Sequence, residues 1–230
     1  LIVPKGEGLR ITGTFLDEIS HDLTFSLRHV YFLCVPMAVG VIFFWEPMIR
    51  ILCLGGNYTE EDLMAARMVA IFYGAGIPAF CSIKVLHARK MMMTTLRYSL
   101  IAIGCNIVLN LILMWHLKQG GIALSTVLAS MLNNTLLLRH LQKEGIPLGS
   151  RSIIRTFARS LGVALAAGTL LYWLYPLLRI RLTFRHVGEF PAFAVLGVLF
   201  LVLYFGGSLL CRAPELPELF SVMRRGKHSA

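Results

Sequence analysis

Long runs of apolar residues, separated by short polar stretches, dominate the pattern along the chain. A bilayer core about 30 Å thick needs about 20 mostly apolar residues in a helix that rises about 1.5 Å per residue. Runs of that length predict about six spans, and the last four of these lack Asp, Glu, Lys and Arg. We therefore predict an all-α fold, a polytopic bundle of transmembrane helices. The predicted spans are residues 27–49, 64–86, 98–117, 120–138, 160–178 and 190–211.

The first two predicted spans carry charges near their ends. These are Arg28 and Glu46 in the first span and Arg67 and Lys84 in the second. Long side chains at such positions can reach the membrane surface, so the charges are compatible with membrane insertion. Residues 46–54 have a proline near their start and alternating polar and apolar positions, which predicts a short interfacial helix on the non-cytoplasmic face.

Composition supports the membrane assignment. Of the 230 residues, 57% are hydrophobic and 15% charged, with a mean hydropathy of +0.71, whereas soluble domains are about 45–50% apolar and about 25% charged. These values argue against a soluble domain and exclude a disordered chain. A net charge of +10 would suggest nucleic acid in a soluble protein, but membrane proteins gather Lys and Arg in cytoplasmic loops. We predict no nucleic-acid partner.

The distribution of basic residues predicts an orientation. Sixteen of the 22 Lys and Arg lie in the N-terminal segment, after the second and fourth spans, and in the C-terminal tail, whereas the intervening loops hold six. Since Lys and Arg are enriched on the cytoplasmic side, both termini are expected to be cytoplasmic. The polar, basic tail is expected to be a frayed end.

The sequence contains no motif for catalysis or metal binding. Its five cysteines form no CxxC pair, its seven histidines form no HExxH, and GxSxG and P-loop patterns are absent. We therefore predict no enzyme activity, no metal and no cofactor.

Small residues recur every fourth position in the fourth predicted span. Because residues four apart share one face of a helix, another helix can approach this stripe closely. Val127 lies about 200° around the helix from Ala129, at about 100° per residue, and is expected to tolerate a larger side chain. The stripe consists of Gly121, Ser125, Ala129 and Asn133.

Two amides in the third predicted span, Asn106 and Asn110, are also four residues apart. An unpaired amide in the bilayer core is costly, so both should face protein or a water-filled cavity. Two interpretations remain open: the amides tie the third span to the fourth, or they contact a substrate directly.

The second predicted span contains Gly74, Gly76 and Pro78 within YGAGIPAF. Proline removes a backbone hydrogen bond and clashes with the preceding turn, which predicts a kink or hinge. Such a break is a moving part in some transporters and static packing in other membrane proteins, and the sequence does not distinguish them.

The densest cationic cluster lies between the second and third predicted spans. It can hold a phosphate, because Lys and Arg recognise phosphate oxygens, although the same residues also follow from cytoplasmic topology alone. The cluster comprises Lys84, His87, Arg89, Lys90 and Arg97.

Three stretches resemble a known family, the lipid II flippases MurJ or MviN of the multidrug/oligosaccharidyl-lipid/polysaccharide exporter superfamily. EPMIRILCLGGNYTEED is similar to the family's EPIxRLLF pattern with its following Gly, aromatic, Thr and Glu-Asp positions. YGAGIPAFCSIKVL is similar to YxxGLPAFxxxKVL, and NIVLNLILMWHLKQGGIALSTVLASMLNNTLLLRHLQKEG to NxxLNLxLxxxLGxxGLALATSLAxxLNxxLLLxxLxxxxG. The resemblance runs from about Phe32 to Leu148.

The resemblance implies the C-terminal part of a fourteen-helix transporter. Such proteins carry lipid-linked peptidoglycan precursor across the bacterial inner membrane by alternating access, and this chain is similar to helices nine to fourteen. The implied partners are a polyprenyl-diphosphate-linked precursor, membrane lipid and eight further N-terminal helices. Lys84, Arg89, Arg97, Asn106 and Asn110 are the candidate substrate-binding residues, and the stripe with Gly74 and Pro78 forms the packing or hinge positions.

The implied organisation has a cytoplasmic segment, four helices of a C-terminal lobe, a cytoplasmic loop, two accessory helices and a cytoplasmic tail. One departure is that Met91 and Thr95 stand at the family's Asp and Pro positions in a loop about four residues shorter. Two alternative functions remain: export of another polyprenyl-linked sugar or a drug, and a non-transporting membrane assembly subunit. The five expected regions are residues 1–26, 27–138, 139–159, 160–211 and 212–230.

Overall fold

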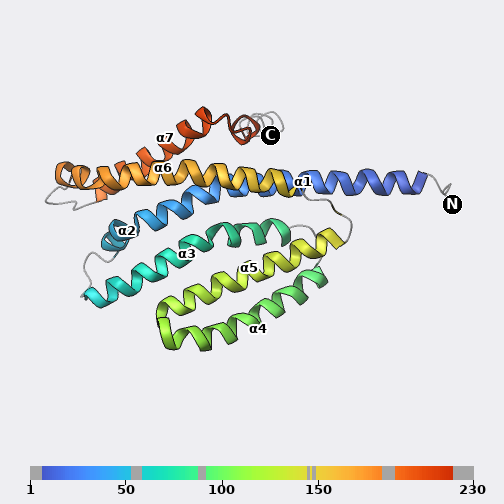
Figure 1. Ribbon diagram of the computed structural model, residues 1–230, viewed down its shortest axis with the longest axis horizontal. Coiled ribbons are helices and arrows are strands. Elements are labelled where there is room, and N and C mark those ends of the chain that lie inside the picture. Colours follow the sequence, from blue (N-terminus) through green and yellow to red (C-terminus); the bar gives the residue numbers. More distant parts are fainter. Residues whose placement is uncertain are drawn as a thin grey trace, which may run out of the picture.

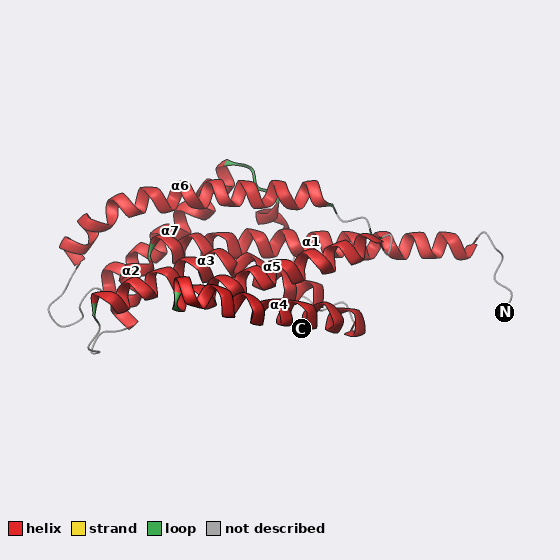
Figure 2. Cartoon of the chain, turned by 60° about the horizontal axis from the view of Figure 1, so that its bottom comes forward, coloured by secondary structure: helices red, strands yellow, loops and turns green. Residues whose placement is uncertain are grey.

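The chain folds into antiparallel helices, as its hydrophobic pattern predicts. The computed structural model describes residues 7–52, 59–87, 92–143, 146, 149–182 and 190–219, and these contain helices but no strand (Figure 2). Six of the helices are long and apolar enough to cross a membrane. The helices are α1 (Glu7–Phe43), α2 (Trp45–Leu52), α3 (Glu60–His87), α4 (Met92–Leu117), α5 (Gln119–Lys143), α6 (Ser150–Leu182) and α7 (Phe190–Leu210).

The first predicted span consists of two helices. α1 begins at Glu7, 20 residues before the predicted start, and its 37 residues exceed the length needed to cross a bilayer at about 1.5 Å per residue. The helix is interrupted at Phe44, and Pro47 lies in the first turn of α2. A proline is tolerated there because the N–H that it lacks would have no partner within the helix. The predicted short helix over 46–54 is therefore present as α2, and Cys53 and Leu54 lie outside the described residues.

The expected loop over residues 139–159 is largely helical. α5 continues to Lys143 and α6 begins at Ser150, because basic residues can extend a helix beyond the bilayer as well as form a loop. The short connection is fixed to α1 by the Gly149 N–H, which donates to Thr24 Oγ1 at 3.1 Å.

The helices pack in an order that differs from their order in the chain. α1 contacts α3 on one side and α6 on the other, while α5 lies between α3 and α4, and α7 packs on α6 (Figure 1). α4 is therefore at one edge, next to α5, and α1 is central. Of the 18 residues in the most apolar window of α4, only 6% are buried, so most of α4 faces outward.

Apolar side chains form two clusters that share α1. One joins Leu23 and Leu27 of α1 to Leu137 and Leu141 of α5, with Ile146 from the connection. The other combines residues of α1, α6 and α7 with Phe44, between α1 and α2, and two residues that follow α7. Its members are Phe32, Val39, Phe44, Ala164, Ala167, Leu171, Leu196, Phe200, Tyr204, Ala213 and Leu216.

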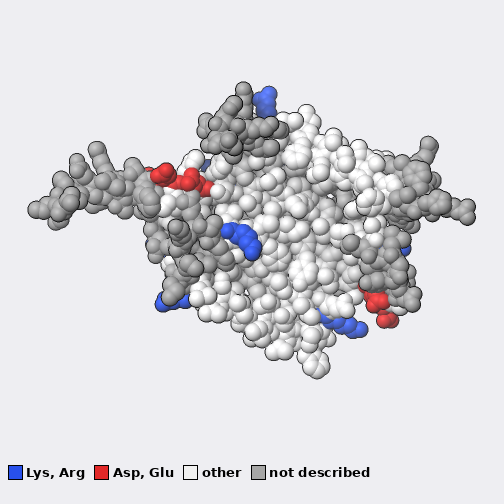
Figure 3. All heavy atoms as spheres, turned by 180° about the vertical axis from the view of Figure 1, so that it is seen from behind, with Lys and Arg blue, Asp and Glu red and all other residues white. Residues whose placement is uncertain are grey.

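The outer surface is apolar. Many large hydrophobic side chains are exposed, including Leu111 at 60% and Trp173 at 78%. White, uncharged side chains cover most of the described part of the face shown in Figure 3, with one basic side chain among them near the middle. Such a surface is expected of helices that contact lipid.

Candidate functional site

The polar residues of α4 and α5 meet at the contact between these helices. Ser125, which is fully buried, donates its hydroxyl to Asn110 Oδ1, and the Asn110 amide donates to Asn106 Oδ1 at 3.3 Å. The Asn133 amide donates to Ser99 Oγ at 3.4 Å. Asn110 and Asn133 thus join α4 to α5, whereas Asn106 contacts Asn110 within α4.

The small-residue stripe of α5 is buried along its length. A Cβ added at Gly121 would overlap the backbone carbonyl of Leu113 in α4, and Ala129 is 5% exposed. Lys118 turns the chain between the two helices with φ of 49°. The close approach of α4 and α5 thus depends on the absence of a side chain at Gly121.

The opposite face of α5 is also occupied, so the expectation that Val127 tolerates enlargement is wrong. Val127 is 4% exposed, and a Cβ added at Gly76 of α3 would lie 2.6 Å from its Cγ2. The Asn134 amide donates to the Ala79 carbonyl of α3 at 2.9 Å. α5 has two helical neighbours, whereas the spacing of its small residues indicates only one.

The predicted hinge in α3 lies where α3 packs against other helices. Pro78 is inside the single helix Glu60–His87. A Cβ at Gly74 would lie 3.0 Å from Ile42 Cγ1 of α1, and the Ser82 hydroxyl donates to the Pro78 carbonyl at 2.6 Å. Gly74 and Gly76 therefore permit close contacts with α1 and α5, as the static interpretation requires.

The described residues include only part of the predicted cationic cluster. Lys84 near the end of α3 and Arg97 in the first turns of α4 are both exposed. α3 and α4 pack against opposite faces of α5 (Figure 1). The two cations therefore lie on either side of α5, toward its C-terminal end. Arg89 and Lys90 lie outside the described residues.

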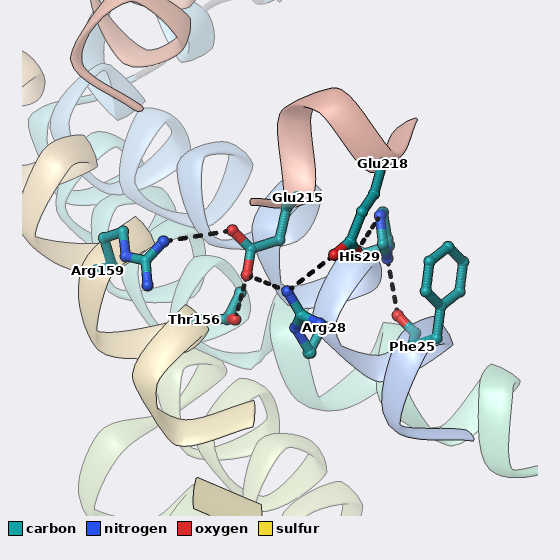
Figure 4. Close-up of polar contacts among 7 residues, drawn as sticks. All are labelled: Phe25, Arg28, His29, Thr156, Arg159, Glu215 and Glu218. Atoms are coloured by element: carbon teal, nitrogen blue, oxygen red, sulfur yellow. Dashed lines mark hydrogen bonds and ion pairs between the residues drawn. The ribbon is translucent and has the colours of Figure 1, made fainter. Parts of the chain in front are cut away.

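A further polar cluster was not predicted. Glu215, only 1% exposed, lies between α1 and α6 in the segment that follows α7 (Figure 4). Its Oε1 accepts hydrogen bonds from Arg28 Nη2 at 2.9 Å and Thr156 Oγ1 at 2.5 Å. Arg159 Nη1 lies 3.6 Å from its Oε2. The expectation of a frayed tail is therefore wrong for this segment, which enters the protein interior.

A second carboxylate extends this cluster. Glu218 Oε1 lies 3.7 Å from Arg28 Nη2, and its Oε2 lies 3.7 Å from His29 Nε2. The Phe25 carbonyl lies 2.8 Å from His29 Nδ1 and accepts its hydrogen bond. Arg28 is 16% exposed and paired with two carboxylates, so its charge has partners within the protein.

The electrostatics of Glu215 favour its charged form. Burial raises the pKa of the Glu215 carboxyl. The hydrogen bonds from Thr156 and Arg28, together with the charge of Arg28, lower it by more, so the pKa lies below its ordinary value. Glu215 is therefore an anion held by two cations. The signal for it in the sequence is Glu215 and Glu218, two acids three residues apart in a basic tail.

Fold and composition together define a polytopic membrane protein built from antiparallel helices. No group of three metal-ligating side chains occurs in the described parts of the chain. Residues 16–184 match the model of the family described as "Lipid II flippase MurJ". Since the match covers more than half of the chain, the protein belongs to the lipid II flippase MurJ family.

Individual relatives agree with this assignment. The "Probable lipid II flippase MurJ" of Vibrio cholerae serotype O1 is 32% identical over 163 residues, which are 69% of this chain and 31% of the relative. The "Lipid II flippase MurJ" of Burkholderia cenocepacia is 30% identical over 215 residues, 85% of this chain and 40% of the relative. The chain thus spans less than half the length of these relatives.

A solved structure has the same fold. The protein described as "Lipid II flippase MurJ, inward closed conformation" superimposes with a TM-score of 0.64 and 21% sequence identity, covering 87% of this chain and 42% of the other. The all-helical transmembrane fold predicted from the sequence is confirmed by this similarity and by the six apolar helices.

Proposed function

We propose that this chain is the C-terminal part of a flippase that carries lipid-linked peptidoglycan precursor across the bacterial inner membrane. The observation that supports the proposal most directly is the family match over residues 16–184, together with relatives named as lipid II flippases. The chain corresponds to 31% and 40% of two such relatives, and the proposal assigns the rest of the transporter to helices outside this stretch of sequence.

Transport by alternating access requires a second bundle. In this mechanism two helix bundles rock about a site between them, and this chain supplies one bundle. The edge position of α4, and the wide apolar surface that it exposes, leave room for a neighbouring bundle next to this one.

The proposed orientation places both termini in the cytoplasm. In Figure 1 the C-terminal ends of α3 and α5 lie toward the same side of the bundle as the start of α1, and 16 of the 22 Lys and Arg lie in the segments proposed to be cytoplasmic. In intact cells, a cysteine at Thr59 should react with an impermeant thiol reagent and one at Ser152 should not. The reverse result would reject this orientation.

The proposed substrate contacts are the cations Lys84, Arg89 and Arg97, with Asn106 and Asn110 as polar contacts in the bilayer. Lys and Arg suit the diphosphate of the precursor because charge-assisted hydrogen bonds to phosphate are strong. Lys84 is exposed near the C-terminal end of α3 and Arg97 near the N-terminal end of α4. In the proposed orientation, a headgroup at the cytoplasmic surface would meet both.

Complementation of a flippase-depleted bacterium tests the proposal. The chain alone should not restore growth, because one bundle cannot enclose the substrate, whereas its fusion to the first eight helices of a family member should. Rescue by the chain alone would reject the two-bundle argument. Depletion of the protein itself tests the alternative exporter, which would be supported by accumulation of a different polyprenyl-linked sugar without accumulation of peptidoglycan precursor. Failure of the fusion to transport any lipid would support a non-transporting subunit.

Substitutions in the functional fusion test the cations. Arg97→Gln and Lys84→Gln should each slow the appearance of precursor on the outer face by about tenfold, the effect of about 1.4 kcal/mol of lost phosphate binding. Lys143→Gln is the matched control, because Lys143 is an exposed cation at the same end of α5. Equal effects at all three positions would indicate general surface charge and reject a specific phosphate site.

A further inference from the structure

The chain reverses direction after α7 in a defined turn. Arg212 adopts a φ of 48°, its N–H donates to the Leu209 carbonyl at 2.9 Å, and the Ala213 N–H donates to the Ser208 carbonyl at 3.0 Å. This pair of hydrogen bonds around a left-handed residue is a Schellman motif, which ends a helix and redirects the chain. Residues 212–219, named here the C-terminal segment, therefore leave α7 in a fixed direction.

Apolar contacts hold the C-terminal segment against the helices. Ala213 is 5% exposed and Leu216 4% exposed, and both belong to the cluster that includes Phe32 of α1, Ala164 of α6 and Tyr204 of α7. Apolar burial is largely non-directional, so these contacts favour docking without defining one docked position.

Charge fixes the docked position. Removing a carboxylate from water costs several kcal/mol unless it is well paired, and Glu215 has its partners only where Arg28 and Thr156 reach Oε1 while Arg159 approaches Oε2. A displacement of the segment along α1 or α6 would leave a buried charge without its partners. Glu215 therefore selects one position for the segment, unlike Leu216.

We propose that the C-terminal segment is a clasp that fastens α7 to α1 and α6, and that its closure depends on Glu215. While the clasp is closed, α1, α6 and α7 move as one body. When it opens, α7 remains joined to α1 at Tyr204, whose hydroxyl donates to the Phe32 carbonyl at 2.6 Å. An apolar groove of about 540 Å³, lined by Leu33, Met37, Phe193 and Leu201 among others, lies along other parts of the two helices and leaves α7 room to shift about that contact.

The proposal is tested by following the exposure of Leu216. In the chain purified in detergent, with its five native cysteines replaced by alanine, Leu216→Cys reports the clasp through its rate of reaction with a water-soluble maleimide. Glu215→Gln keeps the size of the side chain but removes its charge. It should raise the labelling rate at position 216 at least about tenfold, since losing about 1.4 kcal/mol of pairing corresponds to that factor.

Two matched controls make the result specific. Leu141→Cys reports a buried position, 5% exposed, in the other apolar cluster around α1, and its labelling should remain unchanged. Glu218→Gln removes the same charge from a side chain that is 35% exposed, and should raise labelling at position 216 by much less than Glu215→Gln does.

Three results would overturn the proposal: unchanged labelling at position 216, a parallel rise at positions 216 and 141 that indicates general unfolding, or equal effects of the two glutamate substitutions. The measurement requires no transport activity. Its outcome is therefore independent of whether the chain carries lipid.

Discussion

The α4–α5 pair and the group formed by α1, α6, α7 and the C-terminal segment are held together by different interactions. α5 meets α4 through small residues and neutral amides, and the Ser125 to Asn110 hydrogen bond joins residues 15 positions apart. The second group contains the Arg28 to Glu215 contact, which joins residues 187 positions apart. The first contact joins two helices that are consecutive in the chain. The second joins the first helix to the segment that follows the last one.

This difference determines how each region should respond to substitution. A contact between small residues is destabilised when a substitution adds side-chain volume to it. A buried ion pair behaves differently, because removing one member leaves the other as a buried, uncompensated charge. The C-terminal group should therefore respond to changes of charge and the α4–α5 pair to changes of size.

The largest effect is expected at Arg28. Arg28→Leu leaves Glu215 with Thr156 and the more distant Arg159, and should lower the free energy of unfolding by about 3 kcal/mol, measured by chemical or thermal unfolding in detergent. Arg155→Leu, on an exposed arginine of α6, should have little effect. A loss at Arg155 equal to that at Arg28 would remove the distinction between the two regions.

The double substitution Arg28→Leu with Glu215→Leu sharpens this test. Replacing a buried ion pair by apolar side chains is often neutral, so the double variant should be more stable than Arg28→Leu alone. Additive losses would show that the two side chains stabilise the protein independently.

A smaller effect is expected in the α4–α5 pair. Gly121→Ala places a methyl group against the backbone of Leu113, which cannot move as a side chain can, and should cost about 2 kcal/mol. Gly104→Ala of α4 is the control, because an added Cβ there has no atom within 4 Å, and Ala favours a helix by about 1 kcal/mol over Gly. Destabilisation at Gly104 comparable to that at Gly121 would reject the packing argument.

The sequence predicts the local features of this fold well. Apolar runs of sufficient length require helices in a bilayer, and small residues four apart must share a face, so the helices and the buried stripe of α5 follow from spacing alone. The same spacing misses the second neighbour of α5, because Val127 resembles any exposed apolar residue of a membrane helix until Gly76 is placed beside it.

Long-range pairing could not be predicted in the same way. Arg28 near the end of an apolar run looks like a side chain that reaches the membrane surface, and nothing near it in the sequence indicates that Glu215 will pair with it. The tail was expected to be frayed because it is basic overall, whereas its position is determined by two acids within it. For the cations Lys84, Arg89 and Arg97, topology and phosphate binding favour the same residues, so sequence alone cannot separate them.

Acid should weaken the C-terminal group before the α4–α5 pair. The pKa of Glu215 is lower in the folded protein than its ordinary value, so its contribution to stability is fully present above that ordinary value and is lost as the pH falls through the folded pKa. Arg28, Arg159, His29 and Glu218 also face this cluster, and Glu215→Gln isolates the part due to Glu215.

The measurement compares unfolding of the unchanged chain and the Glu215→Gln variant. Their difference in free energy should be constant above about pH 5 and should shrink below about pH 4. A difference that persists unchanged to pH 3 would mean that the charge of Glu215 does not stabilise the fold.

The smallest effect is expected at the turns, where the two regions are alike. Lys118 between α4 and α5, and Arg212 after α7, both adopt φ near 50°, a conformation that costs a residue with a Cβ about 1 kcal/mol. Glycine removes this strain but also increases the entropy of the unfolded chain. Lys118→Gly and Arg212→Gly should therefore each stabilise the protein by about 0.5 kcal/mol, measured by unfolding in detergent. Because both side chains are exposed, the two gains should be equal, and a loss at Arg212 alone would show that its side chain contributes to holding the C-terminal segment.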